Sequence, residues 1–276
     1  MKQKIFDCIT FFNSNLLFEL RFHELKNIVD HFVVCEATRT HMGQPKKINF
    51  NYKKWKKYGD KIIFIKVKDL PEIKKIKKKK DYQLLKIQME KLFLGIKNAS
   101  KEDIIIFSDE DEIPNPNKIK YFNSNKYKYG IFMQNMYNYK INILNMSEGD
   151  GNWPGSRICK KKNLKSFFKL RLLKVKDISQ PIWKFYKEKN IQLIDNGGWH
   201  FSYLMSPILI RNKIKNSAHT ELNKSKYNNI KKIKEKIKNL NDLFDRNLTF
   251  KKVKIDNSYP RYILENKKKF KNWIIK

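Results

Sequence analysis

The chain has 276 residues, of which 41% are hydrophobic and 13% aromatic, and its formal net charge is +34. This length allows one large domain or two small ones, and the apolar content excludes a disordered chain. No run of about 18 apolar residues occurs, and Asp7 interrupts the N-terminal region, so we expect neither a transmembrane helix nor a secretory signal. Three widely spaced cysteines (Cys8, Cys35 and Cys159) predict no disulfide framework or zinc site and favour a reducing, cytoplasmic location.

The large positive charge has two interpretations. Only seven of the 61 basic residues are arginines, and lysine, asparagine and isoleucine are abundant together, as an AT-rich coding sequence would produce. Arginine is the preferred reader of phosphates and bases, so its scarcity disfavours a dedicated nucleic-acid-binding protein. A nucleic-acid surface and peripheral contact with an anionic membrane stay open as functional alternatives.

The first part of the chain predicts a strand–helix–strand unit. Apolar and aromatic residues predict a strand over 5–12, and a polar turn then provides an N-cap for an amphipathic helix over 16–29. A second buried strand over 32–35 completes a βαβ unit, so we expect a parallel sheet here. The polar loop that follows Glu36 is either a functional loop at the sheet edge or a plain surface loop.

The next elements lead to the centre of the chain. We predict a short helix over 52–58, a strand over 61–67, an exposed lysine-rich connection over 74–80 and a helix over 82–96. An unbroken β-branched run over 104–107 then has the pattern of a strand buried on both faces.

Four carboxylates follow this strand directly: Asp109, Glu110, Asp111 and Glu112. Ligands of open α/β sheets bind beyond the carboxyl ends of the strands, and side chains two apart on an extended segment point the same way. Asp109 and Asp111 are therefore predicted to be hard oxygen ligands for Mg²⁺ or Mn²⁺, with space for a substrate phosphate. A solvated acidic loop is the alternative.

The second half shows no internal repeat and no clear linker. We predict an aromatic strand over 129–139, a loop over 145–155 that carries Trp153, a helix over 227–240 and a tail that packs back with Phe270 and Trp273. In the stretch 195–203, Gly197 and Gly198 allow a close backbone approach. His200 follows them, and a lone histidine is more often structural than a ligand.

Several stretches together resemble glycosyltransferase family 17, the group that includes β-1,4-mannosyl-glycoprotein 4-β-N-acetylglucosaminyltransferase. The most specific is 108–114, which matches an SDxDEIP pattern. The others are 7–13 with Glu19 and Arg21, 32–38 with Thr40 and Gly43, and 198–202 with Ser217, His219 and Glu221. Their order and spacing extend the resemblance over nearly the whole chain.

The resemblance implies a GT-A-like α/β fold with a mixed, mostly parallel central sheet flanked by helices. It implies one domain, with a donor half over about 1–125 and an acceptor half with the C-terminal helices over about 126–276. The implied reaction is the metal-dependent, inverting transfer of a sugar, with N-acetylglucosamine expected, from a UDP-sugar to a glycan or glycolipid acceptor.

Roles for single residues follow from the resemblance. Asp109 and Asp111 would form the DxD element that holds the divalent metal (Mn²⁺ or Mg²⁺) beside the diphosphate, and His200 would be a further metal ligand. Inversion needs a carboxylate that takes the proton of the acceptor hydroxyl, and Asp195 and Glu112 are the candidates.

The resemblance also suggests Glu36 and Thr38, together with Asp109, as contacts of the donor nucleotide. Family members often carry Gln-Arg in the helix before the acid strand, where this chain has Gln88 and Met89. If that arginine contacts the donor, Lys86 or Lys91 would have to replace it without the bidentate fork. A nuclease or phosphodiesterase that uses the same acids is the competing hypothesis.

Overall fold

The computed structural model describes residues 2–72, 82–149, 151–181, 183–184, 187–216 and 220–275. The predicted lysine-rich connection 74–80, and the motif residues Ser217 and His219, lie outside this part. The helices are α1 (Asn15–Leu25), α2 (Tyr52–Trp55), α3 (Gln83–Glu90), α4 (Pro116–Ile119), α5 (Phe167–Arg171), α6 (Pro207–Asn216), α7 (Ile230–Lys238), α8 (Arg261–Glu265) and α9 (Lys267–Phe270). The strands are β1 (Ile5–Thr10), β2 (His31–Ala37), β3 (Ile62–Val67), β4 (Ile104–Asp109), β5 (Glu112–Pro114), β6 (Tyr129–Asn138), β7 (Ile143–Asn145), β8 (Asn152–Lys160), β9 (Ile191–Ser202) and β10 (Phe250–Lys252).

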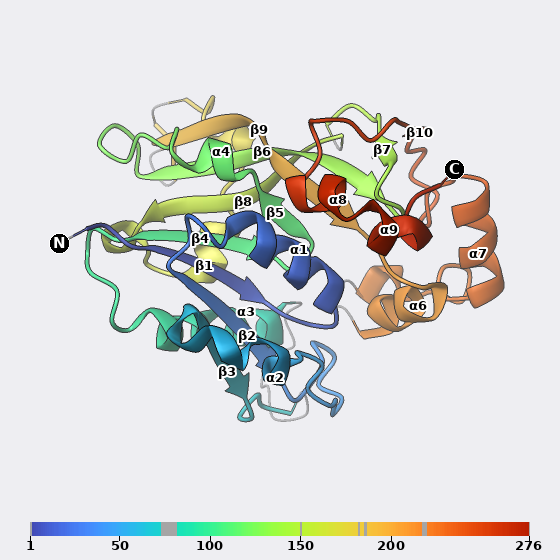
Figure 1. Ribbon diagram of the computed structural model, residues 1–276, viewed down its shortest axis with the longest axis horizontal. Coiled ribbons are helices and arrows are strands. Elements are labelled where there is room, and N and C mark those ends of the chain that lie inside the picture. Colours follow the sequence, from blue (N-terminus) through green and yellow to red (C-terminus); the bar gives the residue numbers. More distant parts are fainter. Residues whose placement is uncertain are drawn as a thin grey trace.

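One mixed sheet runs through the molecule (Figure 1). Its strand order is β10-β7-β6-β8-β4-β1-β2-β3, and β9 lies between β6 and β5. β1 pairs in parallel with β2 and β4, and β2 pairs in parallel with β3, which confirms the predicted βαβ unit. β6 and β9 run in the same direction as these strands, whereas β5, β7 and β8 run the opposite way. The expected GT-A-like α/β class, with a mixed and mostly parallel sheet flanked by helices, is confirmed.

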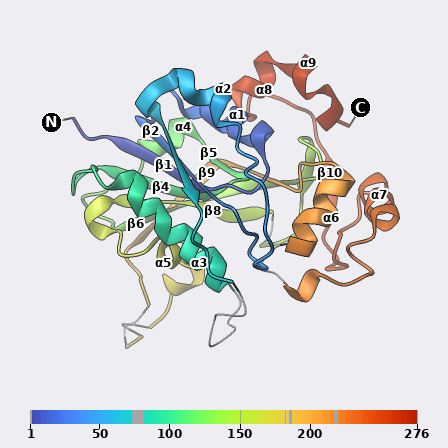
Figure 2. The ribbon, with the colours of Figure 1, turned by 90° about the horizontal axis from the view of Figure 1, so that it is seen from below.

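Helices cover both faces of the parallel strands (Figure 2). Cys8, Val33 and Phe107 belong to the core cluster under α3 and α5. Their neighbours in the strands, such as Val34 and Ile106, belong to the cluster under α1 and α2. Because successive strand side chains point to opposite faces, a strand covered on both sides must be apolar throughout. This arrangement confirms the interpretation of the run 104–107.

Several elements differ in part from the prediction. The helix predicted over 82–96 ends at Glu90 and continues as a 3₁₀ helix, Lys91–Ile96. The loop predicted over 145–155 is wrong in its second part, because Trp153 lies in β8, opposite Gln134 of β6. The glycine and asparagine content suggested a loop, but β8 pairs with both β4 and β6, and this pairing overrides local preference.

The C-terminal segment packs back onto the fold, as predicted, and the element that it contacts is α1. Tyr259, Ile263 and Phe270 share a core cluster with Leu17 and Leu20 of α1. In Figure 1 the red helices α8 and α9 lie beside the blue α1. Within the described ranges, no helix has the length and apolar character needed to cross a membrane.

Candidate active site

A buried ion pair holds the backbone of the acidic turn between β4 and β5. Arg21 of α1 is fully buried and donates to both carboxylate oxygens of Asp7 at 2.7 and 2.9 Å. Its other terminal nitrogen donates to the backbone carbonyl of Glu112 and, at 3.4 Å, to that of Asp109. Two residues of the first family stretch therefore hold the backbone that carries the acids.

Two of the four acids hold neighbouring structure in place. Glu110 Oε2 accepts hydrogen bonds from the backbone N–H groups of Phe12, Asn13 and Ser14 at 2.9, 3.1 and 3.3 Å, at the start of α1. Glu112 Oε1 accepts from Trp153 Nε1 at 2.8 Å. Glu112 Oε2 accepts from the N–H of Asp109 at 3.1 Å, which closes the turn between β4 and β5.

The other two acids face positively charged side chains. Arg171 at the end of α5 donates to Asp109 through Nε, at 3.2 and 3.1 Å, and through a terminal nitrogen at 2.8 Å. Lys213 of α6 donates to Asp111 Oδ2 at 2.8 Å, and His200 Nε2 lies 3.6 Å from Asp111 Oδ1. Each aspartate therefore has a cation from the second half of the chain as its counter-ion.

The two groups of acids differ in their pKa values. Burial opposes ionisation of both aspartates, but Arg171 for Asp109, and Lys213 and His200 for Asp111, hold each carboxyl pKa below its ordinary value. Burial raises the pKa of Glu112, and the negative charge of Asp109 raises it further. Perturbation of this kind is common where a protein performs proton transfer or binds charged ligands.

Asp109 and Asp111 line one cavity of about 240 Å³ at the carboxyl ends of β1 and β4, which we call the acid cavity. Its wall also includes Arg171, His200 and Lys213. Instead of the extended segment that the spacing predicts, Glu110 and Asp111 form a turn after β4. The two carboxylates nevertheless reach the same space.

The donor types in this cavity suit a hard divalent ion, since carboxylate oxygens are the ligands preferred by Mg²⁺ and Mn²⁺. In the described part of the chain, no three His, Cys, Asp or Glu side chains are arranged to hold a metal. Both oxygens of Asp109 accept from Arg171, and Lys213 occupies one oxygen of Asp111. The two carboxylates are chemically suitable ligands for a divalent ion. In this structure Arg171 and Lys213 supply the positive charge beside them that such an ion would supply.

The remaining predicted residues lie outside the acid cavity. Asp195 is exposed in β9, at the irregularity between the residues paired with Phe132 and Gln134. Glu36 is buried, and its oxygens accept from Lys46 and from the N–H groups of Asn49 and Phe50, the latter two at 2.8 Å. The Thr38 hydroxyl donates to the carbonyl of Val67 at 3.3 Å. Glu36 and Thr38 thus hold loops beside the sheet.

Sequence reasoning missed Arg171 and Lys213. Met89 is fully buried in the core, so an arginine at its position would not serve the acid cavity from this backbone. Lys86 and Lys91 also do not line the cavity, and Lys91 pairs with Asp69. The one usable signal was the rarity of arginine, since three of the seven, Arg21, Arg157 and Arg171, surround the acids.

The paired glycines have the predicted role. A Cβ atom on Gly198, whose φ is +139°, would lie 2.1 Å from the carbonyl oxygen of Ile113. A Cβ atom on Gly197 would lie 2.7 Å from Cβ of Phe132. Only glycine lets β9 approach β5 and β6 this closely, and this approach places His200 opposite Glu112 in the β5–β9 register.

One comparison with known proteins, the match to a family model, agrees with the resemblance in the sequence. The sequence model of glycosyltransferase family 17 matches residues 1–149. No curated protein sequence matches the chain. Similar solved structures include 4-diphosphocytidyl-2C-methyl-D-erythritol synthase, with 12% identity over 71% of this chain and 90% of that chain and a TM-score of 0.40. S. aureus TarS 1-349 has 13% identity over 78% and 66% of the two chains and a TM-score of 0.38.

The galactosyltransferase LgtC, solved in complex with donor and acceptor sugar analogs, has 14% identity over 68% of this chain and 72% of that chain, with a TM-score of 0.34. At such low scores the family assignment rests on the sequence match, which covers more than half of the chain and includes the acidic turn between β4 and β5. The chain belongs to glycosyltransferase family 17 and is a glycosyltransferase of that family.

Proposed function

We propose that the chain transfers a sugar, with N-acetylglucosamine as the first expectation, from a UDP-sugar to a hydroxyl group of a glycan or glycolipid acceptor. The observation that carries this proposal is the pair Asp109 and Asp111 in one cavity at the carboxyl end of β4. Membership of a glycosyltransferase family supports the type of reaction, and the acidic pair supports a nucleotide-sugar donor.

The charges of the acid cavity suit a diphosphate. A divalent ion bound by Asp109 and Asp111, beside His200, would stabilise the charge that develops on the leaving UDP. Arg171 and Lys213 are paired with these carboxylates and line the same cavity, so they would contact the phosphate oxygens of a bound donor. We therefore assign the two basic residues to the donor diphosphate.

For the catalytic base we propose Glu112 over Asp195. Inversion by direct displacement needs a carboxylate that accepts the acceptor's proton, and a raised pKa favours that task. Burial raises the pKa of Glu112, and its hydrogen bonds to Trp153 and Asp109 connect it to two residues of the cavity wall. Asp195 is exposed and lies five residues before His200 along β9, roughly 15 Å at strand spacing.

We keep the division into a donor half (about 1–125) and an acceptor half (about 126–276) as part of the proposal. Arg171, His200 and Lys213 come from the second half, so the acid cavity would be completed by both halves. The donor nucleotide would then lie over the first half, as expected for parallel strands with their carboxyl ends at the site.

The test is thermal unfolding with a panel of nucleotide sugars, each with and without Mn²⁺. A ligand at a hundred times its Kd stabilises the native state by about 2.7 kcal/mol. We expect a metal-dependent rise with UDP-N-acetylglucosamine. A rise with another nucleotide sugar would change the donor, and no rise with any of them in a folded sample would overturn the proposal.

Single substitutions then test which acids take part in the transfer. We expect Asp109→Asn and Asp111→Asn to lower the transfer rate by about 100-fold or more, as for removal of other electrostatic groups that stabilise a transition state. Asp69→Asn, at an exposed aspartate, is the matched control. Glu112→Gln should abolish transfer while Asp195→Asn leaves it intact; the reverse result would exchange the two assignments.

A further inference from the structure

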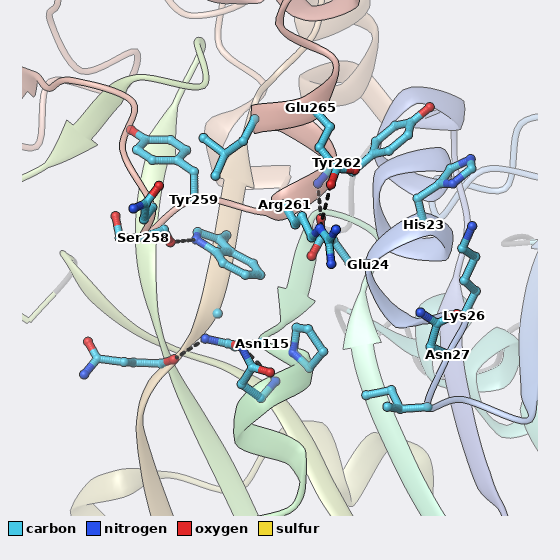
Figure 3. A pocket seen from close by; sticks show the side chains of 18 of the residues that line it. His23, Glu24, Lys26, Asn27, Asn115, Ser258, Tyr259, Arg261, Tyr262 and Glu265 are labelled. Atoms are coloured by element: carbon cyan, nitrogen blue, oxygen red, sulfur yellow. Dashed lines mark hydrogen bonds and ion pairs between the residues drawn. The ribbon is translucent and has the colours of Figure 1, made fainter.

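A second, larger cavity lies on the other side of the β5–β9 ribbon. It has a volume of about 820 Å³, which falls in the usual range of roughly 300–1,000 Å³ for ligand pockets. Along β9, His200 lines the acid cavity and its neighbour Trp199 lines the larger one. Figure 3 shows side chains from α1, from the start of α4 and from the C-terminal segment around this space. We call it the amide cavity.

Its lining is rich in amide side chains. Six of its nineteen lining residues are asparagines, against 29 of 276 in the whole chain, so the abundance of asparagine in this sequence does not explain the cluster. Among the residues that the structure describes, the side chains of Asn27, Asn117 and Asn257 are exposed and make no hydrogen bond to protein. An amide both donates and accepts, which is what a ligand with many hydroxyl groups requires.

The charges of the amide cavity balance. Lys26 and Arg261 are offset by Glu24 and Glu265, and Arg261 pairs with Glu265 at 2.6 Å. Burial, followed by the charge of Lys26, lowers the pKa of His23, so this ring is neutral at neutral pH. In a chain of formal charge +34, a balanced cavity of this size favours an uncharged ligand over a nucleic acid or a lipid phosphate.

The walls are held in place without a ligand. Trp199 Nε1 donates to the carbonyl of Ser258 at 2.9 Å, and the rings of His23 and Tyr262 stack with centroids 4.1 Å apart. Glu24 accepts from the backbone N–H of Tyr262 at 2.5 Å, a bond drawn in Figure 3. Binding to such a preformed surface loses little conformational entropy.

We propose that the amide cavity binds a neutral oligosaccharide, separately from the site of sugar transfer. Its exposed amides would bond the hydroxyl groups, and the partly exposed ring of Tyr262 would contact the apolar face of a sugar ring. Identifying this oligosaccharide with a remote part of the acceptor glycan rests on the proposed function, whereas the binding itself does not.

The experiment is ligand-observed NMR with three neutral probes: chitotetraose, cellotetraose and maltotetraose. The variant Asn117→Ala/Asn257→Ala removes two exposed amides, and Asn239→Ala, an exposed asparagine after α7, is the matched control. We expect at least one probe to bind the wild type, the control and Asp111→Asn equally, and the double variant about fivefold or more weakly, the effect of two hydrogen bonds.

A second variant should block binding instead of weakening it, so its effect is easier to measure. Asn27→Trp places a large ring at an exposed position just after α1 and should block the cavity without touching the core. The proposal is overturned if no probe binds the wild type, or if both variants bind as the control does. Loss of transfer in Asp111→Asn with unchanged probe binding would support an amide cavity that binds independently of the transfer site.

Discussion

The acid cavity and the amide cavity share the strand β9, through His200 and Trp199, but differ in the charge of their linings. In the acid cavity each aspartate faces a basic side chain, in ion pairs that are only partly exposed to solvent. In the amide cavity the charges cancel and exposed amides remain available. If both proposals hold, the β5–β9 ribbon separates the charged donor from an uncharged glycan.

The largest expected effect is on the support of the acid cavity. Arg21→Met should lower the free energy of unfolding by about 3–5 kcal/mol, because it leaves Asp7 buried without its partner. Urea unfolding measures the loss. Arg39→Met, which breaks the partly exposed pair with Glu72, should cost only about 0–1 kcal/mol. Equal losses in the two variants would show that the buried pair has no special role.

The next effect concerns the ribbon that divides the cavities. Gly198→Ala should cost about 2–4 kcal/mol, since the new Cβ would meet the carbonyl oxygen of Ile113 at 2.1 Å and the backbone φ is +139°. Both nucleotide-sugar binding and oligosaccharide binding should weaken together.

Gly149→Ala is the control for this prediction. Its φ is +80° and no atom lies within 4 Å of the new Cβ, so only about 1–2 kcal/mol of backbone strain is expected. Thermal unfolding of both variants compares the costs. A Gly198→Ala variant that is as stable as Gly149→Ala would mean that β5 and β9 can separate freely.

A smaller effect should separate the ligands. Arg171→Met and Lys213→Met should each weaken UDP binding about 10- to 100-fold in calorimetry, because a charge-assisted bond to phosphate is lost. Neutral oligosaccharide binding should stay unchanged. Lys232→Met, at an exposed lysine of α7, controls for net charge. If that control weakens UDP binding equally, the general positive charge and not the acid cavity attracts the donor.

The smallest effect is a pH dependence at the contact between α1 and the C-terminal helices. Burial opposes ionisation of Glu19, but hydrogen bonds from Lys269, Lys54 and Tyr262 lower its pKa to about 2. A lowered carboxyl pKa stabilises the fold above the unfolded pKa of about 4.5, and this contribution disappears as the pH falls towards 2. The docking of α8 and α9 should therefore weaken in acid.

Glu19→Gln removes this dependence. Its free energy of unfolding should change less than that of the wild type between pH 6 and about 3. Unfolding followed by tryptophan fluorescence at each pH measures this difference. Glu265→Gln, which breaks an exposed pair on the same segment, is the matched control. An identical acid response in Glu19→Gln and the wild type would assign the effect to other carboxylates.

Local patterns in the sequence were enough to predict the parallel start of the sheet, the buried run 104–107 and the place of the acids. Periodicity and residue type carry this information, because they reflect which faces of a strand or helix are covered. The need for glycine at Gly197 and Gly198 was also visible, although which strands approach them was not.

Only the tertiary structure decided which of the four acids hold neighbouring backbone and which face a basic side chain. Arg171 lies 62 residues after Asp109, and Lys213 lies 102 residues after Asp111, so no spacing rule connects them. The amide cavity likewise joins α1 to a segment 238 residues later. Pairings between distant segments depend on how strands order and helices pack across the whole chain, and local sequence patterns do not record that order.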